Sequence, residues 1–126
     1  MGLQTETINP LSVFSQHLKP LRERKEYDKA ILRDVVYANK RTEKKDVDEM
    51  RRRHAEAEGK YNDTLREIGD EAAALQKLLV RCGMDAVTAN GLISQKLRDQ
   101  HFSKQEVSAI FAGTTLPLTM KGYDEQ

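Results

Sequence analysis

The side chains that most often carry chemistry in proteins, histidine and cysteine, are few in this chain and stand far apart. Its 126 residues include three histidines, His17, His54 and His101, and one cysteine, Cys82. No two histidines have the four-residue spacing of a helical zinc site, and Cys82 has no histidine near it in the sequence to act as a base. We expect Cys82 to be a small, buried apolar side chain and His54 to be a packing or interface residue.

The carboxylates and glycines also lack a pattern that supports catalysis. Acidic residues occur as surface singles and not as a pair in an apolar segment, and the seven glycines form no phosphate-binding loop. A single cysteine excludes an internal disulfide framework, which fits a reducing compartment. We therefore expect a chain that is not an enzyme and that holds no cofactor or metal.

A basic stretch between residues 40 and 54 is the strongest candidate for binding nucleic acid or an acidic partner, because clustered cations attract phosphates. Its candidate contact residues are Lys40, Arg41, Lys44, Lys45, Arg51, Arg52 and Arg53. Against this, the chain has 21 basic and 20 acidic residues, and no aromatic residue interleaves the stretch for base stacking. Helical spacing also predicts internal ion pairs: Asp48 with Arg52, Glu49 with Arg53, and Arg52 with Glu56. A solvated helix face is the preferred interpretation, with Arg51 left unexplained, and nucleic-acid binding is the alternative.

Two short predicted helices within residues 86–112 offer a second form of that alternative, a helix-turn-helix that reads DNA. The second of these helices presents only Lys104, Gln105 and Ser108 as polar contacts, with Glu106 alongside. Compact helical packing therefore explains the segment better.

A long helix over residues 46–82 is the main predicted element, because apolar or weakly polar side chains recur at steps of three and four. This stripe is the candidate surface for a partner or for self-association: Val47, Met50, His54, Ala57, Tyr61, Leu65, Ile68, Ala72, Leu75 and Leu79. The stripe keeps its phase across Gly59 and Gly69, which we interpret as sites of close helix approach or as weak points. Asp46 is the expected N-cap and Gly83 the expected end signal.

The preceding segments are expected to be a flexible arm over residues 1–8, a short helix from Asn9 that Pro20 ends, and a second helix from Leu21. Residues 39–45 are almost wholly polar. We interpret them as a loop, which folds residues 21–82 into an antiparallel hairpin. The alternative is one continuous helix that pairs with a second copy as a coiled coil.

The last third of the chain is predicted to hold a compact pair of helices over residues 85–112, followed by an extended tail over residues 114–126. Asp85 is the expected cap of the first helix, with Val87, Leu92, Ile93 and Leu97 facing inward. Residues 103–106 form a capping box for the second, with Val107, Ile110 and Phe111 as its apolar side chains. The tail has four candidate contact residues, Leu116, Leu118, Met120 and Tyr123, which we expect to lie on another surface.

These patterns predict an all-α protein with one helical domain over residues 9–113. Because 33% of residues are charged and 38% hydrophobic, little material is available for a thick core, and we expect the protein to be elongated. No apolar run exceeds four residues, so we expect a soluble, cytoplasmic protein without a membrane partner. The expected function is a protein–protein interaction or assembly module, such as an adaptor, assembly factor or small inhibitor. The expected partner is another protein or a second copy in a homo-oligomer, with nucleic acid as the alternative.

Overall fold

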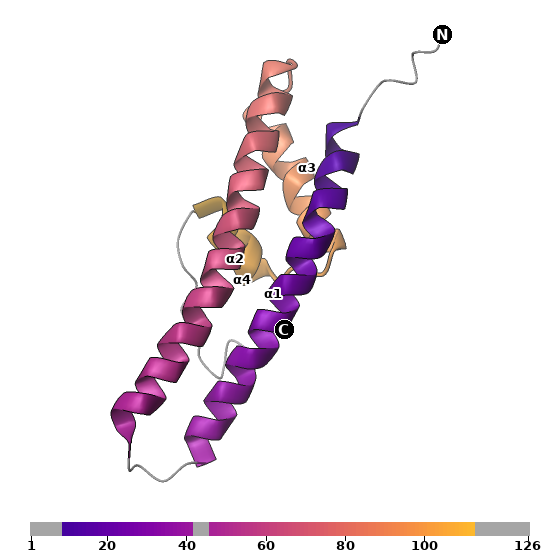
Figure 1. The fold of residues 1–126 in the computed structure, drawn as a ribbon. Coiled ribbons are helices and arrows are strands. Elements are labelled where there is room, and N and C mark those ends of the chain that lie inside the picture. Colours follow the sequence, from indigo (N-terminus) through magenta and orange to yellow (C-terminus); the bar gives the residue numbers. More distant parts are fainter. Residues whose placement is uncertain (1–8, 42–45, 113–126) are drawn as a thin grey trace.

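The computed structural model describes residues 9–41 and 46–112, and the regular structure in this part of the chain is entirely helical (Figure 1). Its elements are α1 (Pro10–Arg41), α2 (Val47–Arg81), α3 (Ala86–Asp99) and α4 (Lys104–Ala112). The predicted all-α class is therefore confirmed. The expected arm and tail lie outside the described residues.

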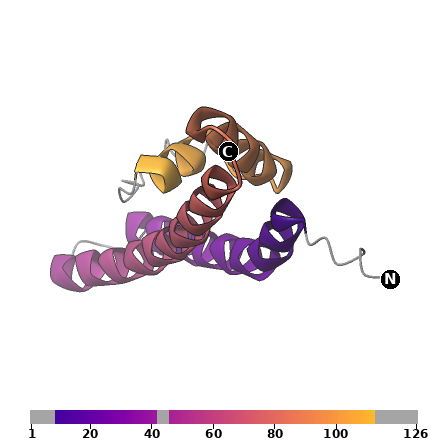
Figure 2. The same ribbon diagram turned by 90° about the horizontal axis from the view of Figure 1, so that it is seen from above.

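Helix α1 corrects the sequence prediction, because it does not end at Pro20 but continues through it to Arg41. An interior proline removes one backbone hydrogen bond and crowds the carbonyl four residues before it. Phe14 and Leu18 before the proline, and Leu32 after it, are buried in one core, so packing on both sides offsets that cost. In Figure 2 the indigo end of α1 turns out of the line of the rest, as is common at an interior proline.

Helix α2 begins and ends where the local signals predict. The Asp46 side chain accepts a hydrogen bond from the backbone N–H of Glu49 at 3.0 Å. At the other end Gly83 has a φ of +105°, and the N–H of Met84 bonds to the carbonyl of Leu79 at 3.1 Å. These contacts satisfy backbone groups that the helix itself leaves unpaired.

Gly69 in α2 is a site of close approach between helices. A Cβ atom built there would lie 3.4 Å from the carbonyl oxygen of Ile110 in α4, whereas one at Gly59 would meet nothing within 4 Å. The absence of a side chain at Gly69 therefore lets α4 lie directly against α2.

Helix α2 contacts each of the other three helices (Figure 2). Helices α1 and α2 run in opposite directions, and α3 and α4 lie together on one side of the pair (Figures 1 and 2). The largest apolar side chains of the core are contributed by all four helices and the α3–α4 connection: Phe14, Leu18, Leu32, Leu65, Ile68, Leu75, Leu79, Ile93, Leu97, Phe102 and Ile110.

Helices α3 and α4 have the predicted caps but partly different inner faces. Ile93 and Leu97 are buried as expected, but Val87 is 81% exposed, and Leu92 and Phe111 are also exposed. In α3 the third buried side chain is Ala89, which lies four residues before Ile93 on the same helix face. Apolar residues occur on more than one face of α3, so only packing against α2 selects the buried one.

Candidate functional site

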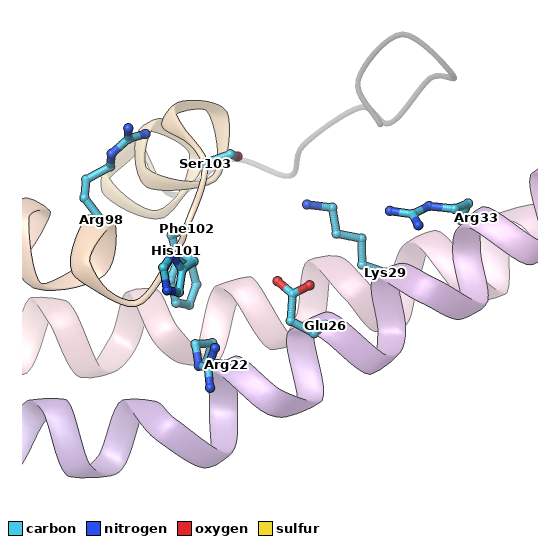
Figure 3. A pocket seen from close by; sticks show the side chains of 8 residues that line it. All are labelled: Arg22, Glu26, Lys29, Arg33, Arg98, His101, Phe102 and Ser103. Carbon is cyan, nitrogen blue, oxygen red and sulfur yellow. The ribbon is translucent and has the colours of Figure 1, made fainter. Parts of the chain in front are cut away.

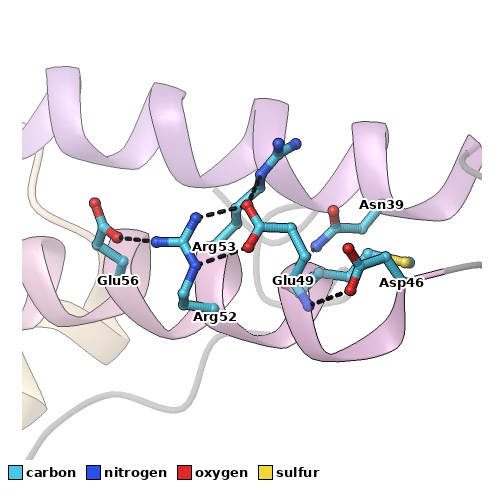
Figure 4. Close-up of polar contacts among 7 residues, drawn as sticks. Asn39, Asp46, Glu49, Arg52, Arg53 and Glu56 are labelled. Carbon is cyan, nitrogen blue, oxygen red and sulfur yellow. Dashed lines mark hydrogen bonds and ion pairs between the residues drawn. The ribbon is translucent and has the colours of Figure 1, made fainter.

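In the part of the basic stretch that lies on α2, two of the arginines are held by carboxylates of the same helix (Figure 4). Arg52 donates two hydrogen bonds to Glu49, at 2.6 and 2.8 Å, and a third to Glu56 at 3.1 Å. Arg53 donates to Glu49 at 3.0 Å. The predicted pairs of Arg53 with Glu49 and of Arg52 with Glu56 are confirmed, whereas Arg52 bonds to Glu49 and not to Asp48.

The pKa of the Glu49 carboxyl reflects these ion pairs. The hydrogen bonds from Arg52, and then those from Arg53, lower the pKa of its carboxyl from 4.5 to about 2. A phosphate that approached these two guanidinium groups would have to compete with an ionised carboxylate already bonded to them. Lys40 and Arg51 are exposed, while Lys44, Lys45 and the Arg41 side chain lie outside the described residues.

The segment proposed as a helix-turn-helix packs its second helix inward. Helix α4 buries Glu106, Ala109 and Ile110. Lys104, Gln105 and Ser108 are exposed, so α4 presents the few polar side chains that the sequence suggested.

Most of the predicted partner stripe on α2 lies in the chain's own core. Seven of its ten residues are buried: Ala57, Tyr61, Leu65, Ile68, Ala72, Leu75 and Leu79. Met50 and His54 are half-buried and Val47 is exposed. In this conformation α1, α3 and α4 take the place that the sequence analysis assigned to a partner.

A buried charge cluster of Lys25, Lys29, Tyr61 and Glu106 joins three helices, and the sequence analysis missed it. Lys25 and Glu106 are both 0% exposed, and the Lys25 Nζ lies 3.2 Å from Glu106 Oε1. The Lys29 Nζ lies 3.5 Å from Glu106 Oε2, and the Tyr61 hydroxyl donates to the same oxygen. Glu106 therefore compensates two buried cations at once.

The α3–α4 connection completes this arrangement around Glu106. The N–H of Ser103 donates to Glu106 Oε1 at 2.9 Å, and the N–H of Glu106 donates to the Ser103 hydroxyl at 3.1 Å, which confirms the capping box. The Lys25 ammonium also lies 4.5 Å from the centroid of the Phe102 ring, a cation–π contact. One carboxylate thus serves both as a helix cap and as the counter-ion of α1.

The pKa values in the cluster follow from burial and charge together. Burial raises the pKa of the Glu106 carboxyl, but Lys25, the Tyr61 hydroxyl, the Ser103 N–H and Lys29 outweigh it, so the pKa lies below its ordinary value. Burial lowers the pKa of the Lys29 ammonium, and Glu106 reverses that only in part. Lys29 is thus a cation that its surroundings do not fully compensate.

A signal for this cluster is present in the sequence. Lys25 and Lys29 fall at helical spacing between Leu18 and Leu32, which are buried on the same face of α1. A charged residue within an apolar face requires a buried partner. The sequence alone could not identify that partner, because Glu106 lies 81 residues after Lys25.

A polar contact on the surface joins α1 and α2 near the cluster. Arg24 pairs with Glu67 and donates to the Thr64 hydroxyl at 3.1 Å. The Thr64 hydroxyl in turn donates to the buried carboxylate of Asp28 at 2.8 Å. These bonds hold the middle of α1 in register with α2.

An apolar groove of about 460 Å³ lies between the beginning of α1 and the end of α2. Its apolar lining consists of Pro10, Val13, Phe14, Ala74, Leu75 and Leu78, and its polar residues are His17 and Glu71. Ala74 and Leu78 are exposed, which places unfilled apolar surface on the outside of the molecule.

Cys82 is exposed, which corrects the expectation of a buried side chain. It follows the last turn of α2 and lies beyond the core residue Leu79, so the core does not cover it. No group of three or more possible metal ligands occurs among residues 9–41 and 46–112. No helix in this part of the chain combines the length and apolar character needed to cross a membrane.

Comparisons with models of protein families, with curated proteins and with solved structures gave no match. The function is therefore argued from the residues and their geometry.

Proposed function

We propose that this chain is a non-enzymatic protein–protein interaction module that associates with copies of itself through the apolar groove. The groove is the observation that carries the proposal. It has about 460 Å³ of space lined mainly by apolar side chains, whereas most of the predicted α2 stripe is already buried. The proposal thus moves self-association from the stripe to the groove, where Ala74, Leu75 and Leu78 of the same long helix contribute.

The proposed occupant is the C-terminal segment of another copy, residues 114–126. Leu116, Leu118 and Met120 alternate with other residues, so in an extended conformation they share one face. Apolar side chains on alternate positions suit a groove that offers apolar surface and few polar groups.

Association between copies is favoured by where the described chain ends. The end of α4 lies against the α2 residues Asn62, Leu65, Arg66, Gly69, Asp70 and Ala73. The groove uses Glu71, Ala74, Leu75 and Leu78, which helical spacing places on a different side of α2. The described chain therefore ends on the side of α2 that faces away from its own groove.

The test is the mass of the full-length protein in solution, measured by sedimentation velocity over a range of concentrations. Ala74→Glu puts a charge into the groove at an exposed helix position, where folding tolerates it. Ala55→Glu makes the same change at an exposed position of α2 outside the groove. We expect concentration-dependent association for the parent and for Ala55→Glu, and its loss in Ala74→Glu.

A second variant, Leu116→Ser with Leu118→Ser, tests the occupant and is expected to dissociate in the same way. A parent that stays monomeric at every concentration contradicts self-association. An oligomer that persists in both Ala74→Glu and the double serine variant contradicts the groove and the tail as its basis.

A further inference from the structure

A basic pocket lies beside the charge cluster, between α1 and the α3–α4 connection (Figure 3). It has a volume of about 480 Å³ and is lined by four cationic side chains, Arg22, Lys29, Arg33 and Arg98, together with His101 and one carboxylate, Glu26. Four full positive charges therefore face one negative charge, in a chain whose net charge is only +1.

Helix α1 and the end of α3 position these side chains. Arg22, Glu26, Lys29 and Arg33 recur at steps of four, three and four, so they share one face of α1. In Figure 3 Glu26, Lys29 and Arg33 project from α1 toward the α3–α4 connection, with Arg98 at the far rim. His101, at the turn between α3 and α4, has a φ of +70°.

The arginines of the pocket lack the carboxylate partners that Arg24, Arg52, Arg53 and Arg66 have. The side chains of Arg22, Arg33 and Arg98 form no ion pair or hydrogen bond with another described residue, and the Arg22 Nε is buried without an acceptor. A buried donor without an acceptor costs free energy, which a ligand oxygen would recover.

The remaining charges of the pocket are already accounted for. Glu26 pairs with the buried Lys25, so its negative charge does not compensate the arginines. Lys29 is 5% exposed, and Glu106, at 3.5 Å, is shared with Lys25. Burial lowers the pKa of the Lys29 ammonium, the direction that an incompletely compensated cation shows. A bound anion would supply a counter-charge for Arg22, Arg33 and Arg98, which have none among the described residues.

We propose that this pocket binds a small ligand that carries two or more phosphate groups. Guanidinium groups bind phosphate oxygens in a bidentate manner, and Lys29 adds a point charge at the base of the pocket. Arg22 and Arg33 are 11 residues apart, about 16 Å along the helix, so the pocket presents cations at more than one point along its length. The volume also falls within the range of about 300–1,000 Å³ that small-molecule sites occupy.

A small ligand fits this pocket better than a nucleic-acid strand does. Lys29 is covered by protein, so an anion can approach it only from within the pocket. A strand lying on the surface would reach Arg33 and Arg98, which are exposed, and would leave Lys29 and the Arg22 Nε without a partner.

The test is calorimetric titration of the full-length protein with inorganic pyrophosphate at low ionic strength. The variant Arg33→Gln with Arg98→Gln removes two exposed cations of the pocket. The control variant Arg51→Gln with Arg81→Gln makes the same change of charge at exposed positions outside it. We expect saturable binding of one pyrophosphate, about tenfold or more weaker in the pocket variant and almost unchanged in the control.

Three results would overturn the proposal. One is the absence of saturable pyrophosphate binding, and another is equal weakening in both variants, which would mean attraction by overall charge alone. The third is a single-stranded oligonucleotide that binds more tightly than pyrophosphate and loses that affinity in the pocket variant. That result would assign the arginines to a nucleic-acid backbone.

Discussion

The beginning of α2 and the basic pocket both gather arginines at helical spacing, yet they differ in whether those arginines are free to bind a ligand. At the beginning of α2, Arg52 and Arg53 are bonded to Glu49 and Glu56. In the pocket, three arginine side chains have no partner among the described residues. The comparison teaches that the density of cations along a sequence is a poor guide to an anion site. The placement of carboxylates decides whether clustered cations are available to bind an anion.

The two regions also differ in how far their charges are exposed to solvent. The ion pairs of α2 are exposed to solvent, which screens the charges and keeps the contribution of each pair to stability small. The pocket is backed by the buried charge cluster, where solvent screens the charges much less. The predictions below follow from this contrast.

The largest expected effect is on stability, in the variant Glu106→Gln. Glutamine keeps the size of the side chain and can still form a capping box, but it removes the carboxylate that pairs with Lys29 and leaves Lys25 with Glu26 alone. We expect the free energy of unfolding to fall by about 3–5 kcal/mol, measured by denaturant titration.

Glu67→Gln is the matched control, because it removes a carboxylate that pairs with Arg24 at the surface. Its effect should stay within about 1 kcal/mol. Equal stability losses in the two variants would mean that the cluster contributes no more than an exposed pair.

The next prediction concerns the titration of Glu49 by NMR. Its carboxyl should titrate with a pKa of about 2, and Arg52→Gln should raise that pKa toward 4.5. Because the pKa is lowered in the folded state, the stabilisation from these pairs is present above pH 4.5 and is lost as the pH falls toward 2. A pKa near 4.5 in the parent protein would show that Arg52 and Arg53 are not held in solution.

The smallest expected effect is on oligonucleotide binding by the ion-paired arginines at the beginning of α2. Glu49→Ala removes the acceptor that Arg52 and Arg53 share, which leaves both more available to phosphates. We expect single-stranded oligonucleotide binding at low salt to strengthen by a few-fold, with a steeper salt dependence. Glu23→Ala makes the same charge change at an exposed position of α1 and serves as a control. Tight binding by the parent that Glu49→Ala does not alter would favour the competing function, nucleic-acid binding through Arg51 or Lys40.

Much of the secondary structure was predictable because it depends on neighbouring residues. The caps at Asp46, Asp85 and Ser103, and the positive φ at Gly83, each complete hydrogen bonds within a few residues of themselves. The prediction that Pro20 ends a helix was wrong because it considered only neighbouring residues. The cost of the proline is local, and the packing that offsets it comes from a helix far along the chain.

The sequence by itself determined the all-helical class, both ends of α2, the starts of α3 and α4, and the face of α2 that is buried, because periodicity and capping are properties of short segments. Only the tertiary structure decided what covers that face, which buried carboxylate compensates Lys25, and which arginines remain unpaired. Those outcomes depend on contacts between residues as far apart as Lys25 and Glu106, 81 positions along the chain. Burial strengthens electrostatic interactions there and makes an unpaired charge costly, so the fold and not the local pattern determines where an anion is needed.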